Sequence, residues 1–97
     1  MARAYELMVI YSGDVAIEQV PEKMESVKAL LAEHGGAVTE VIDWGRRRLA
    51  YPIKRHFEGQ YVLAYFESEG AFPNRPVEQT LQIDESVLRY IIVRRED

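Results

Sequence analysis

The sequence predicts one α+β domain, spanning residues 1–97, in which a four-stranded antiparallel sheet carries two helices on one face. Three observations lead to this fold class. Apolar residues alternate along four segments, which is the period of a strand, and they recur at steps of three and four in two others, which is the period of a helix. The segments follow in the order β, α, β, β, α, β. The chain is long enough for one hydrophobic core, and the ferredoxin-like fold satisfies this order with right-handed crossovers.

The first two elements are a strand over residues 3–12 and a helix that follows it. One face of the strand consists of Tyr5, Leu7, Val9 and Tyr11. Pro21 belongs in the first turn of a helix, because proline lacks the amide hydrogen, so the regular helix should begin near Val20. Gly35 and Gly36 should end it in the left-handed conformation that glycine permits.

The rest of the chain supplies three strands and a short helix. Residues 37–53 are predicted to form one long strand with a bulge at Gly45, because apolar alternation resumes beyond the glycine. A polar turn over 54–59 leads to a strand over 60–67, and a connection rich in proline and glycine covers 68–76. A helix over about residues 77–82 should bury Val77, Leu81 and Ile83. In the last strand, 87–95, one face should hold Leu88, Tyr90 and Ile92 and the other Arg89, Ile91 and Val93.

The composition is that of an ordinary globular protein, with 47% hydrophobic and 29% charged residues. Cysteine is absent, which excludes disulfides and fits a reducing cytosol. No apolar run approaches the length of a membrane span, so we expect a cytoplasmic protein without a membrane partner. With a formal net charge of −4, any contact with nucleic acid must be local rather than driven by overall charge.

Catalytic and metal-binding residues are not predicted. His34 lies at a helix end and His56 in a turn, and both are more simply structural or solvated. Two histidines 22 residues apart, with no carboxylates at ligand spacing, do not make a metal site. Gly35 and Gly36 precede a strand, whereas loops that cradle phosphate run from strand into helix. We therefore expect no enzymatic activity, no metal and no cofactor.

A strip of basic residues on the second predicted strand is the strongest functional signal. It consists of Trp44, Arg46, Arg47 and Arg48, and with Lys54 and Arg55 it places five of the twelve Lys and Arg residues within residues 46–55. Alternation places Arg46 and Arg48 on one face and Arg47 on the other. The strip either protects a sheet edge against unwanted pairing or docks a partner, with Trp44 as an aromatic anchor. Both interpretations can hold together.

A second basic set lies on the first and last predicted strands, which should be neighbours. It consists of Arg3, Arg89, Arg94 and Arg95. Arg89 stands between apolar residues and should project from the open face of the sheet, with Tyr5 or another exposed aromatic beside it. Guanidinium groups and an aromatic surface suit phosphate contact and base stacking. The alternative is an ion pair of Arg89 with Glu6 or Glu67.

Several motifs resemble the bacterial small-subunit ribosomal protein six family. The motifs are Tyr5-Glu6-Leu7-Met8-Val9-Ile10, Gly35-Gly36, Trp44-Gly45-Arg46-Arg47-Arg48-Leu49-Ala50-Tyr51-Pro52-Ile53, Glu58-Gly59-Gln60-Tyr61-Val62-Leu63 and Asp84-Glu85-Ser86-Val87-Leu88-Arg89-Tyr90. The resemblance implies a ferredoxin-like, non-catalytic component of the small ribosomal subunit. It implies binding to the central domain of the small-subunit ribosomal RNA together with ribosomal protein eighteen, after protein fifteen has organised the RNA, and a monomer when isolated.

The resemblance also implies roles for individual residues. Arg47 and Arg48, with Trp44 and Arg46 beside them, match the place where protein eighteen packs. Arg89 matches the arginine of the family's last strand, and Arg3 with Tyr5 its N-terminal basic and aromatic pair, both near RNA. With Lys54, Arg55 and Arg94 they make up the predicted RNA-binding set. One departure is the segment 70–76, which replaces the usual first turns of the second helix and predicts a short helix or a late start.

Two other uses of the same topology compete with this interpretation. An RNA-recognition motif expects a basic residue before the glycine of its third strand, and aromatics after it, but here Glu58 precedes Gly59 and Val62 and Leu63 follow. A regulatory domain that binds a metabolite between subunits is the main alternative; it would form a homodimer whose melting temperature rises with its ligand.

Overall fold

The computed structural model describes residues 2–95. Within that range the elements follow in the predicted order, with a single 3-10 turn (η1) before the first helix. They are β1 (Ala2–Ser12), η1 (Ile17–Gln19), α1 (Val20–Glu33), β2 (Ala37–Ile53), β3 (His56–Glu69), α2 (Asn74–Ile83) and β4 (Val87–Arg94).

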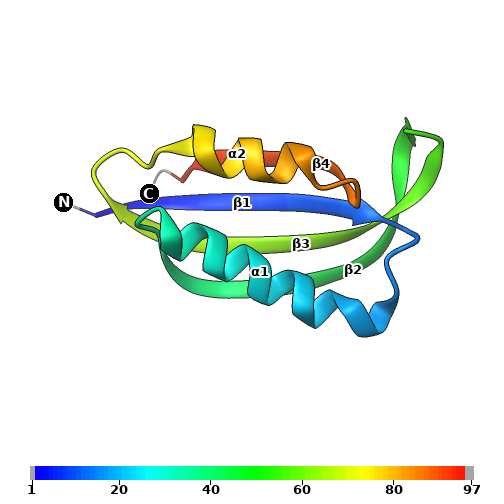
Figure 1. Ribbon diagram of the computed structural model, residues 1–97, viewed down its shortest axis with the longest axis horizontal. Coiled ribbons are helices and arrows are strands. Elements are labelled where there is room, and N and C mark those ends of the chain that lie inside the picture. Colours follow the sequence, from blue (N-terminus) through cyan, green and yellow to red (C-terminus); the bar gives the residue numbers. More distant parts are fainter. Residues whose placement is uncertain (1, 96–97) are drawn as a thin grey trace.

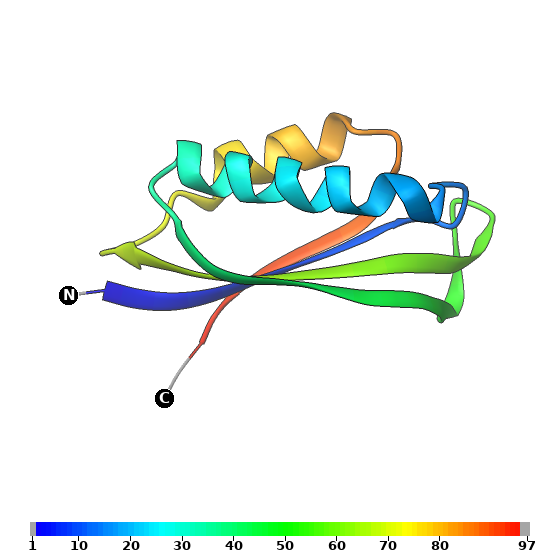
Figure 2. The same ribbon diagram turned by 90° about the horizontal axis from the view of Figure 1, so that it is seen from below.

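The strands form one antiparallel sheet in the order β2-β3-β1-β4, so β2 and β4 are its edges (Figure 1). Both helices cover the same face of the sheet and leave the other face open, as Figure 2 shows. The ferredoxin-like fold class predicted from the sequence is therefore confirmed.

The main core lies between the sheet and the helices. The inward side chains of β1 meet those of the helices there, and the core includes Leu7, Val9, Tyr11, Val20, Val27, Leu31, Val62, Phe66, Val77 and Leu81. Tyr5 belongs to the same layer: it is only 6% exposed, and its ring stacks on Phe66 at 5.3 Å between centroids. Its hydroxyl accepts a hydrogen bond of 3.1 Å from the backbone N–H of Phe72. Tyr5 therefore does not stand on the open face beside Arg89, because the face of β1 that carries Tyr5 is the one that the helices cover; of the two expected possibilities, it is another exposed aromatic that lies there, Tyr51.

The ends of α1 follow the predicted signals. The helix begins at Val20 with Pro21 in its first turn, where the missing amide hydrogen removes no helical bond. Gly35 has φ +93°, and the Gly36 N–H donates to the Leu31 carbonyl at 2.8 Å, which together close the helix in a Schellman motif.

The second helix differs from the prediction in two ways. It begins at Asn74, three residues earlier than predicted, because Pro76 is accommodated in its first turn. Val77 and Leu81 face the core, as predicted, but Ile83 is 81% exposed. Two residues beyond Leu81 is about 200° of helical rotation, so Ile83 points away from the sheet.

The hairpin of β2 and β3 contains the predicted bulge and a tighter turn than predicted. Asp43 pairs with Val62 and Gly45 with Tyr61, which leaves Trp44 as the extra residue, and Gly45 has φ +88°. The turn consists of Lys54 and Arg55 alone, with φ values of +50° and +69°, and Ile53 pairs with His56. Because two residues with positive φ suffice to reverse a twisted hairpin, β3 begins at His56 rather than at Gln60.

The end of this hairpin curves across the sheet toward β4 (Figure 1). A second apolar cluster fastens it there, with Leu49, Ile10 and Leu88 buried and Ile53 and Tyr61 packed against them. Leu88 was predicted to share a face with Tyr90. It joins this cluster instead, because Ile10 pairs with Arg89 and Tyr11 with Val87, so that a bulge turns Leu88 to the open side.

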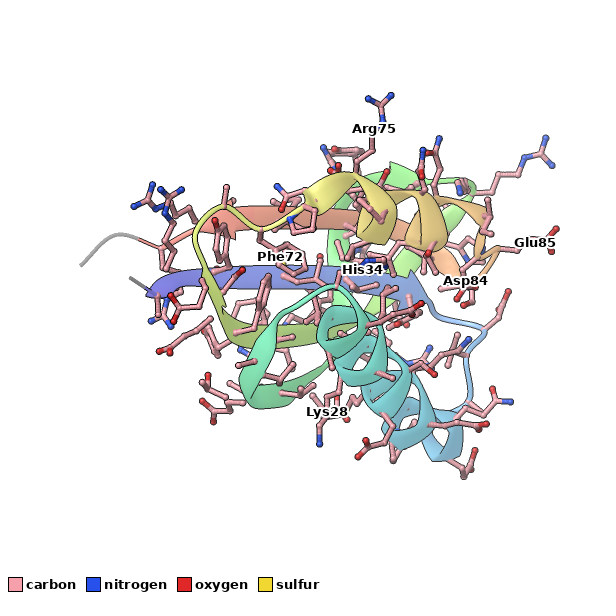
Figure 3. All side chains as sticks on the ribbon, turned by 60° about the vertical axis from the view of Figure 1, so that its left-hand side comes forward. Lys28, His34, Phe72, Arg75, Asp84 and Glu85 are labelled. Carbon is pink, nitrogen blue, oxygen red and sulfur yellow. The ribbon has the colours of Figure 1, made fainter. Side chains whose placement is uncertain are left out.

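The turn between α2 and β4 is held by a polar network (Figure 3 labels Asp84 and Glu85). Asp84 accepts hydrogen bonds from the N–H of Ser86 at 2.9 Å and from its hydroxyl at 2.6 Å. Lys23 of α1 donates to the Ser86 hydroxyl at 3.1 Å, and its ammonium lies 3.8 Å from the Asp84 carboxylate. Burial alone raises the pKa of Asp84, but the Ser86 hydrogen bonds and the Lys23 charge outweigh it and lower the pKa below 3.8. Burial, and secondarily the Asp84 charge, raises the pKa of Tyr11.

We predict that Gly59→Ala destabilises the protein through the second cluster. A Cβ at this position would lie 2.5 Å from Cγ2 of Ile10 and 3.2 Å from the Tyr11 carbonyl oxygen. We expect a loss of ~1–3 kcal/mol in the free energy of unfolding, measured by urea denaturation. The control Ala50→Ser, at an exposed position of the same hairpin, should change it by less than ~0.5 kcal/mol. An unchanged stability for Gly59→Ala would contradict the close packing described here.

We predict that Asp84→Ala lowers stability by ~1 kcal/mol at pH 7. The pKa of Asp84 is lower in the folded than in the unfolded state, so its ionised form stabilises the fold above about pH 4, and that contribution is lost as the pH falls through the lowered value. The loss caused by the substitution should therefore shrink at pH 3. Urea denaturation at both pH values measures it, with the exposed neighbour Glu85→Ala as a control that changes little. A loss of the same size at both pH values would show that the ionised carboxylate is not what stabilises the turn.

Candidate nucleic-acid and protein interface

The bulge in β2 presents an aromatic and cationic pair on the sheet edge. Trp44 is 46% exposed, and the Arg47 guanidinium carbon lies 4.2 Å from the centre of its ring. Arg47 also donates from Nε to the Trp44 carbonyl oxygen at 3.3 Å. The other side of the indole meets Tyr61 edge-on, with 6.1 Å between centroids. Trp44 and Arg47 therefore form one fixed, exposed unit at the edge.

Arg46 and Arg48 lie together on the opposite face of β2, as the alternation predicted. Arg46 forms an ion pair with Glu58 of β3, with 3.6 Å between nitrogen and oxygen. Both arginines line a hollow of about 410 Å³ between the hairpin and the turn after β1. The other residues that line it are Gly13, Asp14, Arg55, His56, Phe57 and Glu58. The four residues of the predicted strip thus occupy two sides of one edge, and the charge on Arg46 is partly neutralised.

The end of the β2–β3 hairpin and the start of β4 carry four further residues, which we call the hairpin-tip cluster: Tyr51, Lys54, Arg55 and Arg89. Arg55 points to the hollow that Arg46 and Arg48 line, whereas the other three lie at the contact with β4. Arg89 is exposed and lies on the open face, since it pairs with Ile10. It donates a hydrogen bond to the Tyr51 hydroxyl, and its guanidinium carbon lies 5.9 Å from the centre of that ring. Lys54 donates from Nζ to the Val87 carbonyl oxygen at 3.5 Å. Arg89 forms no ion pair within residues 2–95, so the expected alternative of a partner in Glu6 or Glu67 does not describe it.

The other predicted RNA-contacting residues lie at the far end of the sheet. Arg94 pairs with Tyr5 and Arg3 with Ser68. The Arg95 guanidinium carbon is 4.5 Å above the ring of Tyr65. These residues lie beside Ala4 of β1, whereas Arg89 pairs with Ile10. Ala4 and Ile10 are six positions apart, which is about 20 Å along a strand. The set predicted from the sequence therefore divides into two groups, and Tyr5, which is buried, belongs to neither.

Tyr51 was not assigned a role from the sequence. Alternation groups it with Leu49 and Ile53. Its side chain is 54% exposed, whereas Leu49 is 8% exposed. The contact with Arg89, which is 38 residues away, arises from the curvature of the hairpin and leaves no local signal in the sequence.

A groove of about 580 Å³ between α1 and the first part of β2 is a further surface that the sequence did not indicate. It is lined by Pro21, Met24, Glu25, Lys28, Val38, Thr39, Glu40, Val41 and Asp43. Over the described part of the chain, no group of three or more His, Asp or Glu side chains could hold a metal ion. Within the same residues, neither helix is long and apolar enough to cross a membrane.

Comparisons with known proteins agree with the motifs. The family model described as ribosomal protein S6 matches residues 4–94. The chain is 43% identical to small ribosomal subunit protein bS6 of Natranaerobius thermophilus, with 98% of each chain covered. It is 42% identical to the bS6 of Fusobacterium nucleatum, over 97% of this chain and 99% of that one. The crystal structure of 30S ribosomal protein S6 from Thermotoga maritima superimposes with a TM-score of 0.89 at 30% identity, covering 98% of this chain and 89% of the other. The chain therefore belongs to the ribosomal protein S6 family of the small ribosomal subunit, which confirms the resemblance seen in its motifs and the expectation that it is not an enzyme.

Proposed function

We propose that this protein helps to assemble the small ribosomal subunit by binding the central domain of its ribosomal RNA together with ribosomal protein eighteen. The observation that carries the proposal is the placement of two different exposed surfaces, one along the β2–β3 hairpin and one where its end meets β4. The edge of β2 has the composition of a protein interface, and the hairpin-tip cluster has the composition of an RNA contact.

The edge of β2 suits a protein partner. Trp44 and Arg47 are held against each other at 4.2 Å, and tryptophan and arginine are the residue types that contribute most to protein interfaces. Arg46 and Arg48 flank this pair on the other face of the strand. β2 is also a sheet edge, whose charges discourage pairing with unselected strands. We assign these four residues to the contact with protein eighteen.

The RNA contact is assigned to cations at the two ends of the sheet, with Arg89 on its open face and Arg3 and Arg94 on the face that carries Tyr5. Lys54, Arg55 and Arg89 form the larger group, and Arg3 and Arg94 a second one at the other end of the sheet. Tyr5 is removed from the assignment because its ring and hydroxyl are both used in the core. A protein of formal net charge −4 has no general attraction for phosphate. This charge balance implies that the protein binds RNA weakly alone and more tightly beside its protein partner. We also propose that the isolated protein is a monomer and that the complex is part of the ribosome in the cytoplasm.

We expect a tagged chain expressed in a bacterium to sediment with small subunits and to bring protein eighteen with it. Trp44→Ala should weaken the binding of purified protein eighteen by ~30-fold or more, because it removes the aromatic anchor of the edge. Isothermal titration calorimetry measures this affinity. Ile83→Ala, which removes an apolar side chain from α2 that is more exposed than Trp44 (81% against 46%), should leave it unchanged. A homodimer in light scattering whose melting temperature rises with a metabolite would favour the regulatory alternative instead.

We expect Arg89→Ala to lower the affinity of the protein pair for central-domain RNA by ~1–3 kcal/mol, and to reduce the slope of log affinity against log salt by about one. Filter-binding titrations at several salt concentrations measure both quantities. The control is Arg75→Ala, because Arg75 is an exposed arginine that points away from the sheet on α2 (Figure 3). Unchanged RNA binding by Arg89→Ala would remove that side chain from the RNA contact.

A further inference from the structure

We infer that Tyr51 and Arg89 form a site for one unpaired nucleotide of RNA, with the base stacked on the Tyr51 ring and a neighbouring phosphate bound by Arg89 and Lys54. This inference rests on the proposed RNA-binding function. It goes beyond that function by adding a residue, Tyr51, and by naming the form of RNA, a single-stranded or bulged nucleotide rather than a duplex.

The first observation is that the arginine beside Tyr51 lies farther from the ring centre than the arginines beside comparable aromatics do. Three arginine and aromatic pairs lie on the open side of the sheet among the described residues. In two of them the guanidinium carbon sits over the ring, 4.2 Å from the centre of Trp44 and 4.5 Å from the centre of Tyr65. At Tyr51 the arginine binds the hydroxyl, and its carbon is 5.9 Å from the ring centre. Arg89 is thus held at the hydroxyl end of the ring, and 54% of Tyr51 remains exposed.

The second observation is the exposure of Tyr51 within an otherwise buried apolar row. Its strand neighbours Leu49 and Ile53 both pack in the second cluster, yet 54% of Tyr51 remains accessible. A large aromatic side chain held in water beside cations is how proteins present a stacking surface to unpaired bases. In a duplex both faces of a base are already stacked, so such a ring gains little from paired RNA.

The third observation concerns the cations around the ring. Within residues 2–95 neither Lys54 nor Arg55 nor Arg89 forms an ion pair, so their charges are free for phosphate. Lys54 and Arg55 also hold left-handed φ values of +50° and +69°. Asparagine and glycine fit such a turn with less strain. Two cationic residues in their place indicate that the charges at this turn serve a ligand.

The site is also rigid before any ligand binds. Ile10, Leu49 and Leu88 bury the root of the hairpin against β4. The Lys54 ammonium reaches the Val87 carbonyl oxygen on the same strand as Arg89. The Tyr51 ring comes from β2 and Arg89 from β4, which are far apart in the sequence, but their hydrogen bond holds them together. Fewer side chains must therefore be ordered when a ligand binds, which lowers the entropic cost of binding.

Two measurements test the inference. In the first, the pair formed with protein eighteen is titrated against central-domain RNA by filter binding. Tyr51→Leu should lose about tenfold or more in affinity, because it removes both ring and hydroxyl. Tyr51→Phe keeps the ring and should lose only about twofold. Tyr65→Leu, the matched control under Arg95, should stay within about twofold of the unsubstituted protein, and thermal melting should confirm that all three variants fold.

In the second measurement, the isolated labelled chain is titrated with a short single-stranded oligoadenylate and, separately, with an RNA duplex, and followed by NMR. The Tyr51 ring protons should move upfield with the single strand and not with the duplex. Ring protons that stay in place, or that respond equally to both, would overturn the inference. The inference would also be overturned if the Tyr51→Leu protein, paired with protein eighteen, bound RNA normally. It would likewise be overturned if the Tyr51→Leu protein no longer bound protein eighteen. If the unsubstituted pair does not bind central-domain RNA, the proposed function fails, and the NMR titration alone then decides whether the nucleotide site exists.

Discussion

The packing of Leu49 between Ile10 and Leu88 is the contact on which the surfaces of this protein depend. A two-stranded hairpin that extends beyond its sheet is marginally stable by itself. Burying one leucine contributes roughly 1.5–3 kcal/mol, and the cluster draws side chains from all four strands, so it holds the hairpin end against β4. Gly59 makes this possible, because any side chain there would collide with Ile10. The apolar contact thus decides where the exposed cations stand.

The distribution of charge follows from the same arrangement. The protein is acidic overall, yet its hairpin is strongly basic on both faces and at its turn. Arg46 is compensated by Glu58, while the cations of the hairpin-tip cluster are left without carboxylate partners among the described residues. The ion pair of Arg46 with Glu58 stabilises the hairpin, and the cations of the hairpin-tip cluster are available to a ligand. Because the acidic protein has little overall attraction for RNA but has local cationic sites, its binding should require both RNA and a protein partner in the correct geometry.

Three tyrosines illustrate how one residue type takes different roles in this fold. Tyr5 is buried in the core, where its hydroxyl accepts a hydrogen bond from a backbone N–H of the loop before α2. Tyr65 carries Arg95 on its face. Tyr51 binds Arg89 through its hydroxyl and remains 54% exposed. The period-two pattern assigned Tyr5 and its neighbours to a common face correctly, but it does not say which face the helices cover.

The sequence by itself determined the order and type of the elements, the start of α1 at Pro21, its end at Gly35, the bulge at Gly45 and the family, because each depends on local backbone chemistry or on a continuous motif. It also placed the arginines of β2 on alternate faces. Only the tertiary structure decided that Tyr5 is buried, that Leu88 turns to the open side, that Ile83 is exposed and that Tyr51 meets Arg89. The burial of Tyr5 depends on which sheet face the helices cover, the turn of Leu88 on a bulge in its pairing with β1, and the exposure of Ile83 on which side of α2 meets the sheet. The contact of Tyr51 with Arg89 depends on packing between residues that are distant in the chain.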